Sequence, residues 1–271
     1  MQKMLFISLL AFALVFSVGP GEVSVIEPEE KIVKNGDSIN AGFIGPGQTL
    51  SITVSSKVDT GGKYGQGGNW DNLKVEDMPD GWISTYSEYG PQLKINVRAP
   101  PDAREGTYRL ELSVNDEMDR EKIGEKVTFY VNVDVREDAV DLYVFPETQV
   151  VQVGSPGRYS VRVTNPSTAS DMFILRGKGI AGWNFEKEVF VPGKSSTTAY
   201  YEIVNTDEET IPVKIEVISK SSDRIRDEAN IVLITKSDPY YDIQSIRNGL
   251  LLYPPAEFLV YSVLYLIAAL I

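Results

Sequence analysis

Apolar and polar residues alternate in short stretches along most of the chain. The clearest stretches are residues 49–56, 92–99, 107–114, 126–135, 158–165, 213–219 and 230–235. Alternation with a period of two, rich in β-branched and aromatic residues, is typical of strands with one buried face. Turn residues separate these stretches, and no long 3.6-residue period with helix caps interrupts them. The pattern therefore predicts an all-β fold of the sandwich type.

The two halves of this region repeat each other. Each half has a Gly-Trp pair: Trp82 lies 28 residues before Leu110 of one predicted strand, and Trp183 lies 30 residues before Val213 of its counterpart. A spacing that agrees this closely indicates an internal repeat. We expect both tryptophans to pack between the sheets of their sandwich, because that space suits a large apolar ring.

Each repeat has the length of one Ig-like sandwich, which is about 100 residues. We therefore expect two tandem Ig-like β-sandwich domains, at residues 22–136 and 137–237. The linker between them, "VREDAVDLYVFPE", is short and rich in strand-forming residues. It predicts a semi-rigid tandem rather than two independently moving units.

The first repeat resembles a known family through "MPDGW", a following strand, and "APPDAREGTYRLELSV". These motifs are similar to those of the NEW domain, a bacterial and archaeal Ig-like domain found beside alpha-galactosidases and in surface-layer proteins, and of the CARDB adhesion-type modules. The second repeat follows the same outline through "VTNPSTASDMF" and "VPGKSSTTAYYEI", but Pro212 replaces the Gly-Thr-Tyr turn of residues 106–108. The resemblance covers residues 38–236 and implies an accessory, non-catalytic surface module without specifying a ligand.

The N-terminus has the three-part plan of a secretory signal. One lysine precedes an apolar run, residues 5–18, and small residues with a proline follow. We expect residues 1–21 to be a signal peptide. Cleavage after Ser17, Gly19 or Gly21 agrees with the small-residue rule, although the proline that follows the second of these disfavours it. An uncleaved anchor is the alternative.

The C-terminus predicts a membrane anchor. Residues 249–271 carry a single charge, Glu257, and would be about 34 Å long if they were all helical, against a hydrocarbon core of about 30 Å. The uninterrupted apolar part, residues 258–271, is too short by itself, so spanning needs the preceding "LLLYPP", local thinning of the bilayer or further residues. We therefore expect residues 238–271 to contain a juxtamembrane segment and a transmembrane helix in contact with the lipid bilayer.

Four polar residues recur every four positions along this expected helix: Tyr253, Glu257, Tyr261 and Tyr265. Residues spaced in this way form one stripe on a helix. Polar groups at membrane depth usually face another helix or an aqueous cavity, so the stripe predicts a protein partner in the membrane. In the alternative interpretation, Tyr253 and Glu257 lie in the headgroup layer and the other two tyrosines face lipid.

Composition narrows the chemistry. The 271 residues include no cysteine and no histidine, which excludes disulfides, thiolate or imidazole zinc sites and Ser/His or Cys/His nucleophiles. A net charge of -12 argues against nucleic acid, because phosphate binding needs clustered Lys and Arg. No D-x-[DN]-x-[DN]-G calcium loop is present. We expect no cofactor, no metal and no catalytic residue.

The segment "GGKYGQGGNW", residues 61–70, is the most unusual part of the first repeat. It is not a phosphate loop, because Lys63 is followed by Tyr64 rather than by Ser or Thr and no helix follows. We expect an insertion between two strands, tipped by Tyr64 and Trp70. Two interpretations stay open: a plain glycine-rich connection, and a contact surface for a protein or a glycan.

Together these features predict a single-pass cell-membrane protein with both domains on the extracytoplasmic side. It is expected to act by contact with protein partners in or on the membrane, as an adhesin, a scaffold or an accessory subunit. A module that binds cell-surface glycan through Tyr64 and Trp70 is the alternative. A glycoside hydrolase with two facing carboxylates is a remote alternative, since nothing among the 38 acids singles out a pair.

Overall fold

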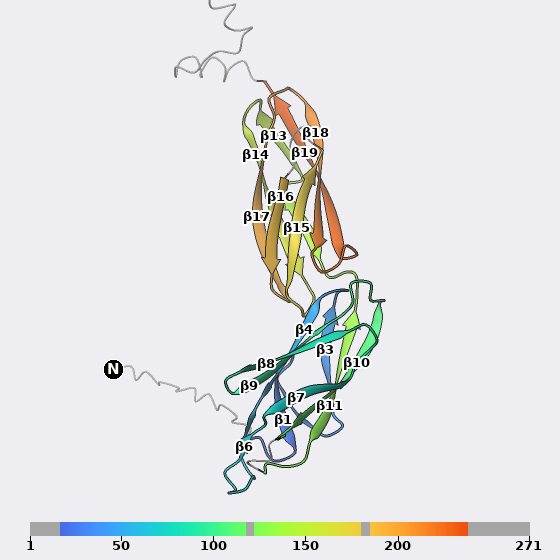
Figure 1. The fold of residues 1–271 in the computed structure, drawn as a ribbon. Helices are drawn as coiled ribbons and strands as arrows, with labels where there is room; N and C mark the ends of the chain where they lie inside the picture. The colour runs from blue at the N-terminus through green and yellow to red at the C-terminus, as the bar shows by residue number, and fades with distance from the viewer. Residues whose placement is uncertain (1–16, 118–121, 180–184, 238–271) are drawn as a thin grey trace, which may run out of the picture.

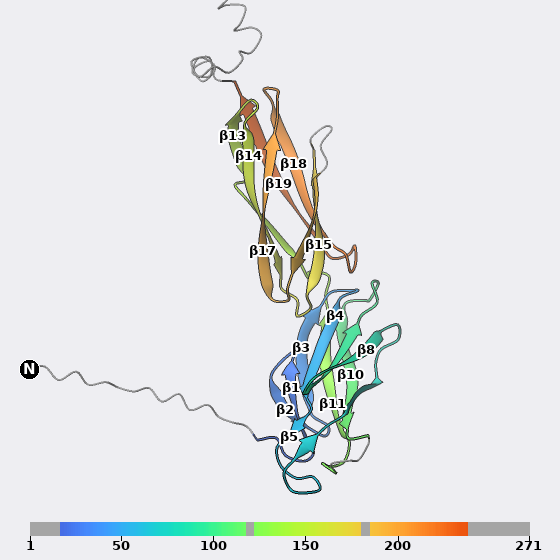
Figure 2. The ribbon, with the colours of Figure 1, turned by 60° about the vertical axis from the view of Figure 1, so that its left-hand side comes forward.

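The computed structural model describes residues 17–117, 122–179 and 185–237. The elements in these ranges are β-strands, arranged as two sandwiches that stack end to end (Figures 1 and 2). These ranges contain no helix that is long and apolar enough to span a membrane. The body of the expected signal peptide, residues 1–16, and the expected anchor, residues 238–271, lie outside them.

The first sandwich is built from β1 (Glu22–Glu27), β2 (Lys31–Lys34), β3 (Ser38–Ile44), β4 (Thr49–Ser55), β7 (Asn72–Asp77), β8 (Ile83–Tyr89), β9 (Gln92–Arg98), β10 (Gly106–Asn115) and β11 (Val127–Val135). One sheet has the order β2-β1-β4-β9-β8 and the other β3-β11-β10-β7. The pairing of β3 with β11 is parallel. The short strands β5 (Lys57–Val58) and β6 (Gly68–Asn69) form a separate ribbon.

The second sandwich is built from β12 (Asp141–Phe145), β13 (Thr148–Gln152), β14 (Pro156–Asn165), β15 (Asp171–Lys178), β16 (Phe185–Val191), β17 (Ser195–Val204), β18 (Thr210–Ser219) and β19 (Arg226–Lys236). Its sheets have the orders β12-β14-β17 and β13-β19-β18-β15-β16. The second strand of this sandwich, β13, pairs parallel with its last strand, β19. The pairing of β3 with β11 in the first sandwich is equivalent.

The strand order is that of an Ig-like fold. In the usual lettering, β1, β4, β9 and β8 correspond to strands A, B, E and D, and β7, β10 and β11 correspond to C, F and G. The tyrosine corner of such domains is also present, since Tyr108 Oη at the start of β10 donates a hydrogen bond to the Arg104 carbonyl at 2.9 Å. The prediction of an all-β, Ig-like architecture is confirmed.

The two repeats differ in the strand that follows each Gly-Trp pair. β8 is joined to β9 by a two-residue turn and pairs with it, so it lies in the sheet of strands A, B and E. β16 pairs with β15 instead and joins the opposite sheet, in the position lettered C′. The repeat therefore holds at the level of the sequence pattern and of seven shared strands, while this one strand changes sheets.

Each sandwich has its own apolar core, which follows from the alternation in the sequence. β11 alternates buried and half-buried residues over its whole length. Trp82 is 5% exposed and its ring lies 5.3 Å from that of Tyr108, so the prediction that it packs between the sheets is confirmed. Trp183 lies outside the described residues, and its position stays a prediction.

One polar cluster borders the first core. The Glu76 carboxylate on β7 accepts hydrogen bonds from Ser113 Oγ at 2.7 Å and from Lys126 Nζ at 3.1 Å. These two hydrogen bonds, that from Ser113 first, lower the pKa of the Glu76 carboxyl to about 2. The carboxylate thus ties β7 to β10 and to the start of β11.

Candidate functional site

The glycine-rich segment forms the end of the molecule farthest from the second domain (Figures 1 and 2). β5 and β6 pair as an antiparallel ribbon, and the connection between them, residues 59–67, is called the tip loop below. Gly61 and Gln66 form a bridge within it. Gly67 has a φ of 77°, and a Cβ there would lie 1.9 Å from the Val58 carbonyl oxygen, so this position requires glycine.

Lys63 and Tyr64 lie on the surface of the tip loop. Tyr64 is 78% exposed, and Lys63 Nζ lies 5.3 Å from the centroid of its ring, in a cation–π contact. Together with neighbouring polar residues, among them Lys57, Gln66 and Asn69, they line a concavity of about 390 Å³. The combination of one exposed aromatic ring with polar groups suits contact with a protein or a polar ligand.

Trp70 does not belong to this surface. The expectation that it tips the loop is wrong: the residue is 1% exposed and is part of the first apolar core. Its backbone N–H donates to the Ser56 carbonyl at 2.6 Å, which returns the chain to the sandwich just before β7 and turns the indole inward. A large apolar ring gains more from this burial than from exposure, so the candidate contact residues reduce to Lys63 and Tyr64.

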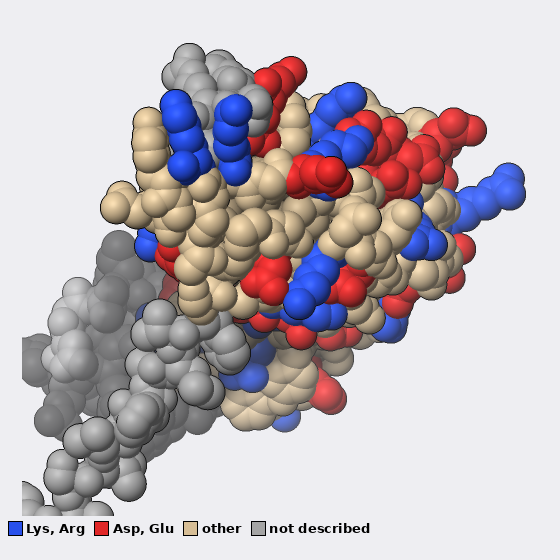
Figure 3. Space-filling model, turned by 90° about the horizontal axis from the view of Figure 1, so that it is seen from below, with Lys and Arg blue, Asp and Glu red and all other residues tan. Residues whose placement is uncertain are grey.

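The charge on this end of the molecule is mixed. Figure 3 shows basic and acidic side chains interspersed over it. Lys57 of the ribbon pairs with Asp59 at 2.8 Å, so part of its positive charge is balanced by a neighbouring carboxylate. The surface therefore lacks the one-sided basic character that phosphate-rich partners select.

A buried polar network joins the two domains. Asp171, at the start of β15, accepts hydrogen bonds from Gln48 Nε2 of the first domain at 2.7 Å, and from Ser219 Oγ at 2.6 Å and Ser221 Oγ at 2.8 Å. Gln48 Oε1 accepts a hydrogen bond from the Gly45 N–H at 2.7 Å. Gln48 is 1% and Asp171 is 6% exposed. A buried carboxylate is costly unless it is hydrogen-bonded, so this network favours one relative orientation of the domains.

Other contacts surround the network. Thr168 N–H donates to the Phe43 carbonyl at 2.8 Å and Thr168 Oγ1 to the Ala41 carbonyl at 2.7 Å. The Phe43 side chain packs against the core of the second domain. On another side, Arg224 Nη1 donates to the Ala103 carbonyl at 3.1 Å. Because apolar packing and directional hydrogen bonds act together here, the junction resists bending.

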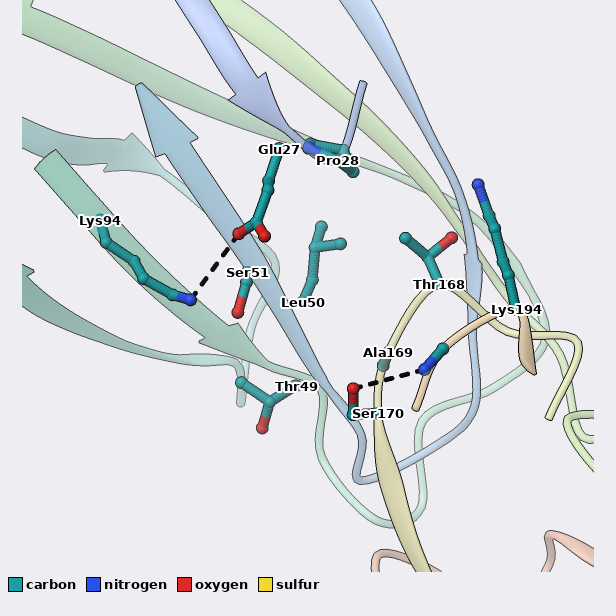
Figure 4. A pocket seen from close by; sticks show the side chains of 11 residues that line it. Glu27, Pro28, Thr49, Leu50, Ser51, Lys94, Thr168, Ala169, Ser170 and Lys194 are labelled. Atoms are coloured by element: carbon teal, nitrogen blue, oxygen red, sulfur yellow. Dashed lines mark hydrogen bonds and ion pairs between the residues drawn. The ribbon is translucent and has the colours of Figure 1, made fainter. Parts of the chain in front are cut away.

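A pocket of about 480 Å³ opens beside this junction (Figure 4). Lys94 and Glu27 of the first domain form an ion pair at 3.7 Å on one side, and Ser170 and Lys194 of the second domain lie opposite (Figure 4). The full lining is Glu27, Pro28, Thr49, Leu50, Ser51, Lys94, Thr168, Ala169, Ser170, Gly193 and Lys194. It contains one carboxylate, so this pocket does not provide the pair of acids that glycoside hydrolysis requires.

The stripe of Tyr253, Glu257, Tyr261 and Tyr265 lies outside the described residues. Within the part of the chain that is described, no group of three or more acidic side chains is placed to hold a metal ion.

No protein-family model and no curated protein sequence matches this chain. Among solved structures, it is similar to a titin Ig tandem, with 10% sequence identity over 80% of this chain and 98% of that chain and a TM-score of 0.28. The titin domains z1z2 in complex with telethonin match with 12% identity over the same shares and a TM-score of 0.27. A PapD-like domain of human CEP192 matches 37% of this chain and 86% of that chain, with 10% identity and a TM-score of 0.26. The strand orders described above define the class, which is a tandem Ig-like β-sandwich protein.

Proposed function

We propose that this chain is an exported, membrane-anchored protein whose two rigidly stacked Ig-like domains present the tip loop to a protein partner. Lys63 and Tyr64 are the proposed contact residues. The protein acts by binding, and no residue is assigned a catalytic role.

The observation that carries this proposal is the placement of the tip loop and the last strand at opposite ends of the molecule. β19 ends at Lys236 at the far end of the second domain, and the tip loop lies at the far end of the first (Figure 1). An anchor that follows residue 237 therefore makes the tip loop the point most distant from the bilayer. The Gln48–Asp171 network supports the same function, because an orientation fixed on folding leaves less freedom to be lost on binding.

The leader at residues 1–21 and the anchor at residues 238–271 are proposals from the sequence. They place both domains on the extracytoplasmic side of the cell membrane. The resemblance to surface modules of the NEW and CARDB type supports this location, since such modules are accessory domains of surface proteins.

Affinity capture tests the role of the tip loop. The full chain is extracted from membranes in mild detergent, and the proteins that accompany it are identified by mass spectrometry. Tyr64→Ala should reduce the recovery of the partner at least tenfold, whereas Tyr200→Ala should not. Tyr200 is a matched control because it is also 78% exposed but lies on β17 of the second domain. Equal recovery with both variants would refute the role of the loop.

A separate contact is proposed inside the membrane. Glu257→Leu combined with Tyr261→Leu and Tyr265→Leu removes the polar stripe and should abolish capture of a transmembrane partner while leaving the tip-loop contact intact. Unchanged capture would eliminate this contact. Recovery of the unmodified chain in the cytosolic fraction would eliminate membrane anchoring altogether.

Glycan binding is a second candidate at the junction pocket, rather than at Tyr64 and Trp70 as the sequence suggested, on one observation: the polar lining of that pocket. Ser51, Lys94 and Thr168, which carry hydroxyl and ammonium groups, are among the residues that line it, and such groups can hydrogen-bond the hydroxyls of a sugar. Lys94→Ala should then weaken binding to an oligosaccharide array and Tyr64→Ala should not. An array without signal for the unmodified chain would dismiss this candidate.

A further inference from the structure

The last residues of the expected signal peptide, residues 18–21, are part of the folded first domain. Val18 is 7% exposed, while Ser17 before it is exposed. Val18 exchanges two hydrogen bonds with Asp59 of the tip loop: its N–H donates to Asp59 Oδ2 at 3.0 Å, and its carbonyl accepts from the Asp59 N–H at 2.8 Å. Among the described residues of this segment, burial thus begins at Val18.

The next residues continue this packing. Pro20 lies against the tip loop, since a Cβ on Gly61 would be 2.4 Å from Pro20 Cγ. Gly19 N–H donates to Glu22 Oε2 at 3.0 Å, and the Glu22 N–H donates back to the Gly19 carbonyl at 3.2 Å. Residues 18–21 therefore pack against the tip loop, and their removal would expose the side of the loop that they contact.

We propose that the signal sequence is cleaved between Ser17 and Val18, and that the new α-ammonium group of Val18 binds the Asp59 carboxylate at the base of the tip loop. The inference rests on the export included in the proposed function and makes it more specific. It shortens the leader expected at residues 1–21 by four residues, because cleavage after Gly21 would discard the segment that holds the loop.

The reaction is hydrolysis by a membrane-bound signal peptidase. Water adds across the Ser17–Val18 peptide bond: the hydroxyl group goes to the Ser17 carbonyl carbon, which becomes a carboxylate, and the released Val18 amine takes up a proton. Ser17 is small, as the residue before such a bond must be. The product replaces an amide N–H donor by an ammonium donor, so that both partners of the hydrogen bond to the Asp59 carboxylate are ionised.

The charges around Val18 are compatible with an added ammonium group. Asp59 faces it directly, and Lys57 Nζ lies 2.8 Å from the other Asp59 oxygen. Glu22 faces the neighbouring Gly19 and pairs with Lys34 at 3.1 Å. Hydrogen bonds from Lys57 and from the Val18 N–H already lower the pKa of the Asp59 carboxyl, which keeps it ionised near neutral pH.

The N-terminal peptide of the exported chain decides the question. The full-length gene product is expressed in a cell with a secretion system, purified from the membrane fraction, and its N-terminal peptide is identified by mass spectrometry. A mature chain that begins at Val18 is the expected result. A chain that begins at Pro20 or Glu22, or a membrane-inserted chain that keeps Met1, overturns the inference while export stands. A cytosolic chain that keeps Met1 overturns the proposed export itself.

Two substitutions distinguish cleavage after Ser17 from cleavage after Gly21. Ser17→Tyr places a large side chain directly before the proposed bond and should abolish cleavage there. Gly21→Asn should leave the mature N-terminus unchanged, since asparagine tolerates the φ of 76° and a Cβ meets no atom within 4 Å. The opposite response, with Ser17→Tyr processed normally and Gly21→Asn blocked, would place cleavage after Gly21.

A third comparison tests the ion pair apart from the cleavage. Asp59→Asn is made in chains that begin at Val18 and in chains that keep residues 16 and 17, where the Val18 nitrogen is an uncharged amide. The substitution should lower the thermal midpoint by several degrees more in the chain that begins at Val18. Equal shifts in both chains would show that the carboxylate does not bind a terminal ammonium group.

Discussion

Replacing Gln48 by alanine should weaken the junction between the two domains. The substitution removes the hydrogen bond from Gln48 Nε2 to Asp171 at 2.7 Å and leaves the Gly45 N–H without its acceptor. Gln48 is 1% exposed, so water does not readily replace either bond.

The expected loss of unfolding free energy follows from these contacts. A hydrogen bond to a charged group contributes about 1.5–3 kcal/mol, and a buried donor left without a partner costs about 1–3 kcal/mol. Gln48→Ala should therefore lower the free energy of unfolding by about 2.5–6 kcal/mol. Asp171→Ala should cost about as much or more, since Ser219 and Ser221 also lose their acceptor. The coupling energy between the two substitutions should be about 2 kcal/mol, which is the part due to their mutual bond.

Urea unfolding of the full chain in detergent, followed by tryptophan fluorescence, measures all four members of this double-mutant cycle. Lys178→Ala is a suitable control, because it breaks a partly exposed ion pair with Glu216 within the second domain and should cost less than about 1 kcal/mol. A coupling energy below about 0.5 kcal/mol between Gln48 and Asp171 would refute the view that their hydrogen bond fixes the domain orientation.

The remaining predictions concern pH, backbone geometry and the two aromatic residues near the tip loop. The folded-state pKa of Glu76 is about 2, below its ordinary value of 4.5, so its contribution to stability is present above pH 4.5 and is lost as the pH falls toward 2. The difference in urea midpoint between the unmodified chain and Glu76→Gln should therefore shrink over that range. A difference that stays constant would contradict this prediction. Gly47→Ala should lower the free energy of unfolding by well over ~2 kcal/mol, because the φ of Gly47 is 73° and a Cβ there would lie 2.1 Å from a backbone oxygen of the second domain. Gly36→Ala should lower it by only about 1–2 kcal/mol, because Gly36 has a φ of 87° but open space around it. Equal losses of stability in urea unfolding would count against the close approach of the domains. Trp70→Ala should lower the free energy of unfolding by about 3–5 kcal/mol as a core truncation, and Tyr64→Ala should change it by less than about 0.5 kcal/mol, so a stability loss from the second would mean that Tyr64 supports the fold.

The strands could be predicted from the sequence because the signal is local. Alternation over residues 107–114 places one face of β10 in the core, and β10 spans Gly106–Asn115. The repeat spacing likewise predicted that Trp82 is buried. A period of two reports which side chains face inward, since successive residues of a strand point to opposite faces.

The candidate site was only half predictable for the same reason. Glycine content marked the insertion, and an aromatic residue between glycines, Tyr64, is exposed as expected. Trp70 follows a similar run of glycines, but its backbone bond to Ser56 turns it into the core. Local composition does not encode that bond, because it depends on where another strand ends.

The sequence by itself determined the fold class, the two repeats, the missing imidazole and thiol chemistry, and the location of the glycine-rich insertion. The tertiary structure decided which sheet β8 and β16 join, that Gln48 meets Asp171, and that Val18 is hydrogen-bonded to the tip loop. These contacts join residues separated by 41 positions in one case and 123 in the other. Such pairings arise when whole sheets pack together, so they are properties of the assembled fold rather than of any short stretch of residues.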